Sequence, residues 1–351
     1  MYKYVIFGDA TSPHLLKWAK VLNTKVDLYV ASSTSFSNEW DTFLLPEKRL
    51  SFNQEKKHGG GNLSILFKVF NLYKWINRIK PDIINPHYLT SHGFMIFLLK
   101  KIFGLDFFML SSAWGSDILV TPNKNLLYKL AIKYVLNYSD LCTSDSRDMS
   151  EKMRKLGAKK IYTFFFGLLD EPTYPYFCKE KWLFFSNRGL EDIYQPFQVL
   201  DFFRDISRNN SAARLIIANK GSLEPEMKAY VEEYGLVSKV SFVGFLSEKE
   251  QQHYYKKSQW YFSLPKSDSG SVSLLEAMAF GCIPILSDLP ANREIIGDNG
   301  LILKKNDDYS KLEEIISRKN DIIDNNYKWI LEKGLFKKSI NVLLSKIENF
   351  I

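Results

Sequence analysis

Residues 259–288, QWYFSLPKSDSGSVSLLEAMAFGCIPILSD, contain a strand, a loop, a helix and a second strand in succession. QWYFSLP is rich in aromatic residues and closes at Pro265, whereas LLEAMAFG has the composition of a helix that ends at Gly281. IPILSD then predicts the next strand. A strand, a helix and a strand in this order indicate a parallel pair joined by a crossover helix. The stretch therefore predicts an α/β fold.

The same alternation extends toward the N-terminus. Strands are predicted at 4–8, 26–32, 81–87 and 106–114, with helices near 14–22, 91–103 and 125–137. A second series, WLFFSN, RLIIANKG and KVSFVGF, follows the aromatic and proline-rich FFFGLLDEPTYPYF. We therefore predict two doubly wound, Rossmann-like domains that face a central cleft. The expected boundaries are 1–165, a linker at 166–177, 178–335, and a C-terminal helix at 336–351 that packs back toward the first domain. Residues 51–63, with three adjacent glycines, predict a loop.

Composition excludes several classes of protein. The 351 residues are 46% hydrophobic, enough for two packed domains, and the three cysteines are too scattered for a disulfide framework or a zinc site. The N-terminus MYKYVIFGDA alternates like a strand and lacks the features of a signal peptide. The most apolar stretch, 94–110, is interrupted by charged residues. We therefore expect a cytoplasmic protein without a membrane span.

The loop before the helix has the features of an anion site. It follows the carboxyl end of a strand, and the N–H groups of Val272 and Ser273 lie at the start of a helix, where they lack helical partners and carry a partial positive charge. Small side chains, Ser271 among them, allow a phosphate to approach the backbone. In the alternative interpretation Asp268 and Ser271 only cap the helix, and Glu276 is a first-turn acid favoured by the dipole.

The stretch resembles the donor-site signature of glycosyltransferase family 4, whose members are retaining, nucleotide-sugar-dependent enzymes with the GT-B fold. The matching positions are two acids separated by seven residues, an Ala-Met-Ala and a Gly-x-Pro: Asp268, Glu276, 277–279, Gly281 and Pro284. The family usually has Glu at the first acid. The resemblance continues through NREIIGDNGLIL at 292–303. It implies that Glu276 holds the ribose and that Asp268 meets the donor sugar.

The same resemblance assigns further donor contacts in the second half. FFSNRGLEDIYQPFQVLDFF is similar to the segment that opens the family's C-terminal domain, so Arg188 is expected to bind the diphosphate. The family often has a lysine five residues later, where this chain has Ile193; neutralisation would then depend on Arg188, Lys220 and the helix N-terminus. Phe245 and Leu246 are the expected contacts of the base.

The N-terminal half carries a weaker resemblance. Gly8 and the residues after it are similar to the family's first loop, where backbone N–H groups face the donor phosphates. No G-x-G-x-x-G follows the first strand, which disfavours a dinucleotide site. SSAWGSDIL is similar to a segment that often carries His-Gly-x-Asp near the transferred sugar, which gives Asp117 a catalytic role, although it could equally cap the next helix. Trp114 replaces the histidine, and His87 or His14 is the expected substitute, with an ordinary structural role as the alternative for both.

These assignments imply a retaining transfer from a nucleoside-diphosphate sugar, with a UDP-sugar favoured, to a hydroxyl of a glycan or lipid-linked saccharide in cell-surface polysaccharide assembly. No covalent nucleophile is assigned. Asp-x-Asp, the metal-binding pair of GT-A enzymes, does not occur in the sequence, so no metal or cofactor is expected. The alternatives are a catalytically idle GT-B protein that binds nucleotide sugar as a scaffold and, less favoured, a GT-B epimerase or phosphorylase.

Charge is distributed unevenly along the chain. Residues 1–165 contain 23 Lys and Arg against 13 Asp and Glu, whereas residues 166–351 contain 24 against 26. The basic excess of the first half predicts an anionic partner, such as a membrane surface on the inner face of the cell membrane or a phosphate-bearing acceptor, and no nucleic acid is expected. A solvated basic surface is the alternative interpretation.

Overall fold

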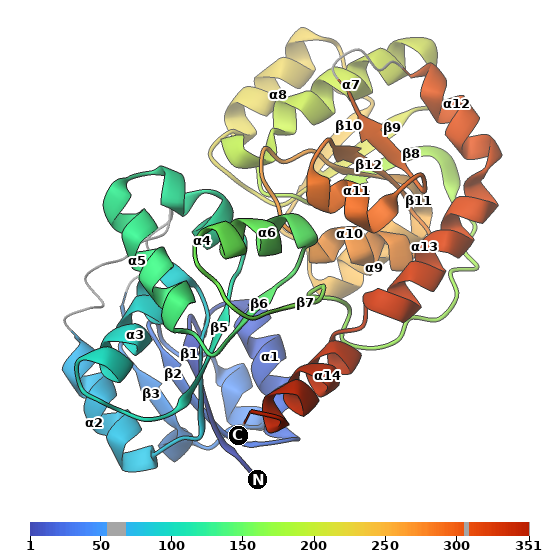
Figure 1. Cartoon of the computed structure of the whole chain (residues 1–351). Coiled ribbons are helices and arrows are strands. Elements are labelled where there is room, and N and C mark those ends of the chain that lie inside the picture. Colours follow the sequence, from blue (N-terminus) through green and yellow to red (C-terminus); the bar gives the residue numbers. More distant parts are fainter. Residues whose placement is uncertain (55–67, 305–308, 351) are drawn as a thin grey trace. The chain divides into compact units, whose positions relative to one another are not determined.

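The chain folds into two compact units. The computed structural model describes residues 1–54, 68–304 and 309–350. One unit comprises Met1–Phe165 with Lys337–Ile351, and the other comprises Phe166–Phe336 (Figure 1). Residues 166–177, expected as a linker, are thus part of the second unit. Residues 55–63 of the expected loop lie outside the described residues.

The first unit is a parallel sheet with helices on its faces. Its strands in the described residues have the order β3-β2-β1-β4-β5-β6-β7. Their bounds are β1 (Lys3–Gly8), β2 (Asp27–Ser32), β3 (Arg49–Ser51), β4 (Ile83–Pro86), β5 (Phe108–Ser112), β6 (Leu141–Ser144) and β7 (Ile161–Thr163). The helices are α1 (Pro13–Asn23), α2 (Val69–Ile79), α3 (Phe94–Lys101), α4 (Ser116–Leu119), α5 (Leu126–Tyr138) and α6 (Arg147–Lys155).

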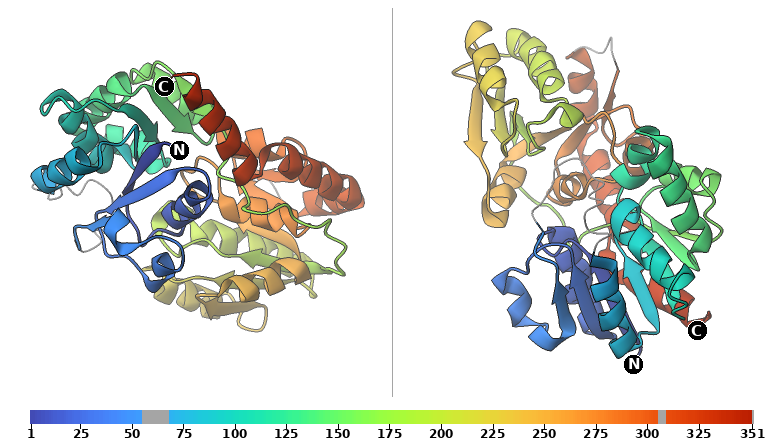
Figure 2. Two further views of the ribbon diagram at one scale, coloured as in Figure 1. Left: turned by 90° about the horizontal axis from the view of Figure 1, so that it is seen from below. Right: turned by 90° about the vertical axis from the view of Figure 1, so that its left-hand side faces the viewer.

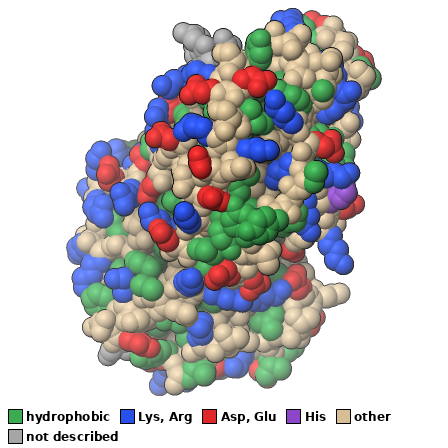
Figure 3. Space-filling model, turned by 90° about the vertical axis from the view of Figure 1, so that its right-hand side faces the viewer, with side chains coloured by type: hydrophobic (Ala, Val, Ile, Leu, Met, Phe, Trp, Pro, Cys, Tyr) green, Lys and Arg blue, Asp and Glu red, His purple; other side chains and the backbone are tan. Residues whose placement is uncertain are grey.

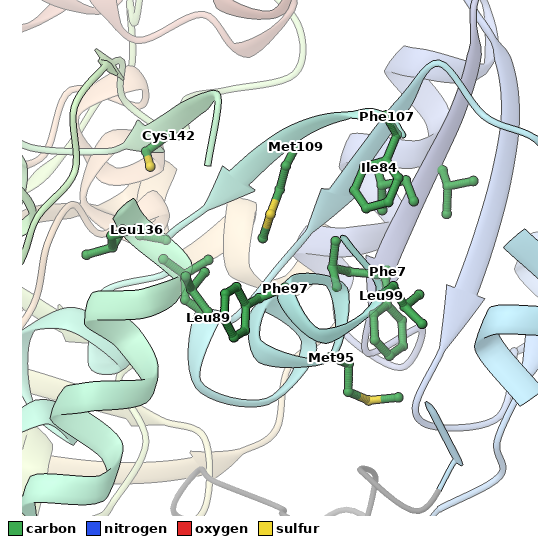
Figure 4. Packing of buried hydrophobic residues seen from close by; sticks show 14 of the residues in the cluster. Phe7, Ile84, Leu89, Met95, Phe97, Leu99, Phe107, Met109, Leu136 and Cys142 are labelled. Carbon is green, nitrogen blue, oxygen red and sulfur yellow. The ribbon is translucent and has the colours of Figure 1, made fainter. Parts of the chain in front are cut away.

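The core of this unit lies between the sheet and the helices. Every residue of β1 except Lys3 is buried, as expected for a central parallel strand that is covered on both faces. Figure 4 shows Met95 and Phe97 of α3 in one hydrophobic cluster with Ile84 of β4 and Met109 of β5. The packing fixes the strand ends from which the polar residues of this unit project.

The last helix, α14 (Phe336–Glu348), leads the chain back into the first unit. The ring of Phe350 stacks on Phe108 at 5.9 Å between centroids, and the Lys160 ammonium lies 4.1 Å from the centroid of the Phe350 ring. Figure 2 shows the C-terminal end of the chain beside this unit. Aromatic and cation–π contacts thus hold the C-terminal segment against strands of the first sheet.

The second unit repeats the architecture. Its described strands have the order β10-β9-β8-β11-β12-β13: β8 (Glu180–Ser186), β9 (Arg214–Ala218), β10 (Val240–Gly244), β11 (Ser258–Ser263), β12 (Ile283–Ser287) and β13 (Leu301–Leu303). Its helices are α7 (Pro196–Asn209), α8 (Glu224–Glu233), α9 (Glu248–Lys257), α10 (Val272–Ala279), α11 (Pro290–Ile296), α12 (Ser310–Ser317) and α13 (Lys319–Lys333). The prediction of two doubly wound, Rossmann-like units is confirmed.

Strand order determines where a ligand can bind in each sheet. The order reverses between β1 and β4 in the first unit and between β8 and β11 in the second. At such a reversal the loops after the two strands diverge and leave a crevice at the carboxyl ends. The predicted site residues follow these strands and their neighbours.

No helix of the described residues has the length and apolar character needed to cross a bilayer.

Candidate functional site

The loop after β11 leaves the start of α10 open to an anion. Ser271 is the N-cap, but its side chain makes no capping bond. Its carbonyl accepts from the N–H groups of Leu274 and Leu275, at 3.2 and 3.3 Å. The N–H groups of Val272 and Ser273 have no hydrogen-bond partner among the described residues. Two donors at a helix N-terminus are therefore available to a ligand.

Arg188 reaches this helix end from the loop after β8. Its guanidinium donates to the hydroxyl of Ser271, to the hydroxyl of Ser273 at 3.3 Å, and to Oδ2 of Asp268 at 2.8 Å. The side chains of Arg188 and Asp268 are only 16% and 19% exposed. Burial alone would lower the pKa of Arg188, but the nearby charge of Asp268 reverses the effect and the pKa rises. The structure thus brings together four residues predicted as donor contacts.

The contact between Arg188 and Asp268 was not anticipated. The sequence assigns them to different groups of one donor, yet here they form an ion pair across the strand reversal. Tyr194 adds a second contact that the sequence analysis missed, because the Arg188 guanidinium lies 4.7 Å from the centroid of its ring. An aromatic face and a carboxylate together orient the guanidinium toward the end of α10.

Glu276 lies inside α10 and is half-buried. The helix begins at Val272, and its first turn contains no acid, so Glu276 is not the dipole-favoured first-turn acid of the alternative interpretation. The hydroxyl of Tyr255 donates to Oε2 of Glu276 at 3.2 Å. Asn187 in turn donates to the Tyr255 oxygen at 2.7 Å. The Glu276 carboxylate is therefore oriented by a chain of hydrogen bonds from the end of β8.

Lys220 is brought beside the Arg188 loop by backbone contacts. The N–H of Leu190 donates to the Lys220 carbonyl at 3.1 Å. Gly221 makes this approach possible, since a Cβ at this position would lie 2.2 Å from the Leu190 carbonyl oxygen. The Lys220 side chain is exposed, and the structure gives it no ion pair with another described residue. A second cation is thus available near the diphosphate-binding candidates.

The two expected base contacts differ in exposure. Phe245 and Leu246 follow β10, where Gly244 has a φ of +69° and its carbonyl accepts from the N–H of Asn219 at 2.6 Å. This bond joins the loops after β9 and β10. Phe245 is 75% exposed, whereas Leu246 is 8% exposed and belongs to the core. Only the Phe245 ring offers a surface on which a base could stack.

His87, at the end of β4 in the first unit, is buried and fully engaged. Trp114 Nε1 donates to Nδ1 of His87 at 2.9 Å, so the ring proton resides on Nε2, which donates to Oδ1 of Asn85 at 2.9 Å. Burial, with a smaller effect of the nearby His92, lowers the His87 pKa to about 3. Both nitrogens are occupied and the ring is neutral, which corresponds to the structural alternative rather than to a proton-transfer role.

Asp117 links two loops of the first unit. Its Oδ2 accepts from the N–H of Leu89 and its Oδ1 from the N–H of Trp114, both at 2.9 Å. It is completely buried, and burial raises its pKa to about 6. It is the second residue of α4, and backbone N–H groups at the start of that helix, those of Asp117 and Ile118, also favour its charged form, so the helix-cap alternative stays beside the catalytic role. Asp117 positions Trp114 from within the core.

Gly8 and His14 complete the predicted residues of the first unit. A Cβ at Gly8 would lie 2.6 Å from a methyl carbon of Leu15 and 3.4 Å from Cβ of His87, so glycine allows β1 to end between them. His14 is exposed on the first turn of α1, and its ring meets Trp114 edge-on with centroids 5.4 Å apart. Of the two histidines proposed as substitutes for the family's histidine, whose position Trp114 occupies, His14 is the accessible one.

Comparisons with known families cover both units. The family described as "Glycosyl transferase 4-like" matches residues 3–146, and "Glycosyl transferases group 1" matches residues 176–327. The chain belongs to the family 4 type of GT-B glycosyltransferases. The resemblance seen in residues 268–284 is thereby confirmed. A curated relative, the alpha-monoglucosyldiacylglycerol synthase of Streptococcus pneumoniae, is 25% identical over 100 residues; the match spans 28% of this chain and 23% of the relative's length.

Solved structures of GT-B glycosyltransferases share the fold of this family 4 chain. The lipopolysaccharide outer core galactosyltransferase WaaB, in its apo form, has a TM-score of 0.74 at 18% identity, covering 98% of this chain and 99% of that one. HepE of Anabaena, in complex with UDP-glucose, has a TM-score of 0.76 at 11% identity, covering 99% and 100%. At these identities the likeness establishes the fold.

A last feature of this family 4 chain concerns the side chains that could bind a metal ion. No group of three or more His, Cys, Asp or Glu side chains is arranged to hold a metal ion within residues 1–54, 68–304 and 309–350. Metal independence remains a prediction to be tested by a chelator.

Proposed function

We propose that the protein is a retaining glycosyltransferase that uses a nucleoside-diphosphate sugar, with a UDP-sugar favoured, and transfers the sugar to a hydroxyl of a glycan or lipid-linked saccharide in cell-surface polysaccharide assembly. The observation that carries this proposal is the cationic helix end in the second unit, where Arg188 and the N–H groups of Val272 and Ser273 converge. Known proteins of similar fold support the choice of donor: HepE binds UDP-glucose.

In the proposed reaction the bond between the anomeric carbon and the diphosphate breaks, and a bond to the acceptor oxygen forms on the same face. The products are the glycoside, the nucleoside diphosphate and one proton. Negative charge increases on the leaving diphosphate, and Arg188, Lys220 and the start of α10 stabilise it. Glu276 accepts hydrogen bonds from the ribose. No protein nucleophile and no metal take part.

Asp268 is proposed to exchange partners during this cycle. In the structure its Oδ2 lies 2.8 Å from Nη2 of Arg188. A bound diphosphate would compete for the guanidinium, because it carries more charge than the carboxylate, and Asp268 would then accept from a sugar hydroxyl. A donor that carries both a diphosphate and a sugar would thus offset the cost of opening the ion pair more fully than a nucleoside diphosphate alone.

We further propose that the protein works in the cytoplasm at the inner face of the cell membrane, where a lipid-linked acceptor would lie. The basic excess of residues 1–165 supports this placement.

A catalytically idle scaffold is the second candidate function. It is favoured by Trp114, which stands where the family often has histidine and donates its N–H to His87. Such a protein would bind the nucleotide sugar but would not release nucleoside diphosphate from it.

Three measurements test these proposals. Thermal shifts with UDP-, GDP- and ADP-sugars identify the base, since a ligand at 100 times its Kd adds about 2.7 kcal/mol to the stability of the fold. Slow hydrolysis of the preferred donor then reports turnover without an acceptor, and NMR of the first anomer released reports retention. Arg188→Gln should abolish release, whereas Arg208→Gln, at an arginine side chain that is 64% exposed on α7, should not. Binding without any release would favour the scaffold, and no binding would refute both.

A further inference from the structure

Helix α5 of the first unit presents an apolar surface to solvent. Leu126 is 68% exposed, Leu127 77%, Leu130 41% and Tyr134 50%. With about 100° of rotation per residue, these four side chains fall within one arc of about 100° on the helix. Single exposed leucines are ordinary, but three leucines and a tyrosine on one face form a contiguous patch that calls for a partner.

The opposite face of α5 holds the helix in place. Ile132, Val135 and Leu136 are buried in the core of the unit. Tyr134 stacks on Phe97 of α3 with centroids 5.8 Å apart, and Tyr138 meets the same ring edge-on at 5.0 Å. The buried face thus fixes the helix together with the half-exposed Tyr134, and it leaves the side chains of Leu126, Leu127 and Leu130 exposed. Figure 1 shows α5 on the outside of the first unit beside α3.

Positive charges flank the apolar arc. Lys129 and Lys133 are exposed on one side of it, and neither forms an ion pair with another described residue. Neither α3 nor α5 contains Asp or Glu, and Lys101 of α3 lies 5.3 Å from the ring centroid of Tyr138. On the face shown in Figure 3, by contrast, basic side chains alternate with acidic ones around a central hydrophobic group.

We propose that the outer face of α5, formed by Leu126, Leu127, Leu130, Tyr134, Lys129 and Lys133, docks the protein on an anionic lipid bilayer. Leucines beside lysines without acidic neighbours are the composition of an interfacial helix, whose apolar face enters the acyl boundary while the ammonium groups contact lipid phosphates. An acidic protein partner would pair with the lysines, but it would bury the four adjacent apolar side chains only if its own surface had pockets that match them. The inference rests on the proposed function only for its purpose, which is access to a lipid-linked acceptor.

Vesicle sedimentation of the full chain tests the proposal. The wild type should bind vesicles of equal phosphatidylglycerol and phosphatidylcholine, and should bind pure phosphatidylcholine much more weakly. It should dissociate from the anionic vesicles in about 0.5 M salt, because the screening length shortens to roughly 3 Å near 1 M salt. The double variant Lys129→Gln/Lys133→Gln should lower partitioning about 25-fold, because each lysine near an anionic surface contributes about fivefold to the partition coefficient. Leu126→Gln/Leu127→Gln should lower it at least about tenfold.

Matched controls separate docking from net charge. Lys249→Gln/Lys257→Gln removes the same charge from exposed positions of α9 and should leave partitioning within about twofold of the wild type. Equal losses in both lysine pairs, or a wild type that ignores anionic vesicles, would overturn the proposal. A change in sedimentation coefficient of Leu126→Gln/Leu127→Gln without vesicles would instead indicate contact with a second copy, which also overturns it.

The test is independent of the donor site. UDP affinity of the α5 variants, measured by calorimetry, should equal that of the wild type, because α5 belongs to the first unit, whereas Arg188, Glu276 and the start of α10 belong to the second. A protein that binds vesicles but no nucleotide would refute the proposed function and leave the docking surface standing.

Discussion

Replacement of Glu276 by glutamine is the sharpest test of the donor site. Glu276→Gln preserves the shape of the side chain and can still accept from Tyr255, whose hydroxyl lies 3.2 Å from Oε2. It removes the charge that would strengthen two hydrogen bonds from the ribose. A charge-assisted bond contributes about 1.5–3 kcal/mol and a neutral one about 0.5–1.5 kcal/mol, so the loss is about 1 kcal/mol per bond. Two bonds correspond to roughly 30-fold weaker UDP binding.

Calorimetric titration of UDP into the wild type and the variant measures this difference. Glu232→Gln, the same substitution at an exposed position of α8, is the matched control and should bind UDP as the wild type does. The melting temperature of Glu276→Gln should change little, because Glu276 is neither in the first turn of α10 nor part of its cap. Unchanged UDP affinity in Glu276→Gln would refute the assignment of this carboxylate to the ribose.

Four further predictions follow from the contacts. Asp268→Asn should leave UDP affinity unchanged or slightly higher, because it releases Arg188, and should reduce donor turnover; a parallel loss of UDP binding would contradict the sugar-contact role. Gly221→Ala should lower the free energy of unfolding by about 1–3 kcal/mol in denaturant titrations and weaken UDP binding, because its Cβ would meet the Leu190 carbonyl; a neutral variant would show that the Lys220 loop adjusts freely. The raised pKa of Asp117, about 6, means that the folded state retains the proton more tightly, so this group stabilises the fold fully below the unfolded value of 3.8 and loses that contribution as pH rises through 6. The free energy of unfolding of the wild type should therefore fall between pH 4 and 7 by on the order of 3 kcal/mol relative to that of Asp117→Asn. Parallel curves of unfolding free energy against pH would refute the shift. Donor hydrolysis should survive EDTA, and loss of turnover that Mn²⁺ restores would reject metal independence.

The alternation of strands and helices was predictable from the sequence because long elements carry clear patterns. Most inner strands were found, since a buried parallel strand is a nearly continuous apolar run. β6 was missed, because its four residues, LCTS, form no such run. β3, β7 and β13 were missed because each has only three residues, too few for any periodicity. The helix expected near 91–103 starts instead with a π-helical turn, Leu89–Gly93, after Tyr88 at a φ of +72°. No sequence signal marks that departure.

The candidate site was predictable in part. Spacing and the family resemblance located the acids and Arg188, and the structure places Arg188 and Asp268 after the adjacent strands β8 and β11 and Glu276 inside α10. The partners of these residues were not predictable, because they come from distant segments. Tyr255 is 21 residues from Glu276, and Arg188 is 80 residues from Asp268. The occupied nitrogens of His87 likewise depend on Trp114, 27 residues away. A single sequence does not record such pairings.

The two sheets share a strand order, but their reversal points differ in charge. In the first unit the side chains beside the reversal are neutral or already hydrogen-bonded. His87 has a pKa of about 3, and the Asp117 carboxylate accepts hydrogen bonds from the N–H groups of Leu89 and Trp114. In the second unit Arg188 and the open end of α10 provide positive potential. A leaving diphosphate gains charge as its bond breaks, so its stabilisation must come from preorganised positive groups. The second unit alone offers these among the residues discussed, and we therefore expect substitutions of Arg188 to lower turnover far more than neutral substitutions around His87.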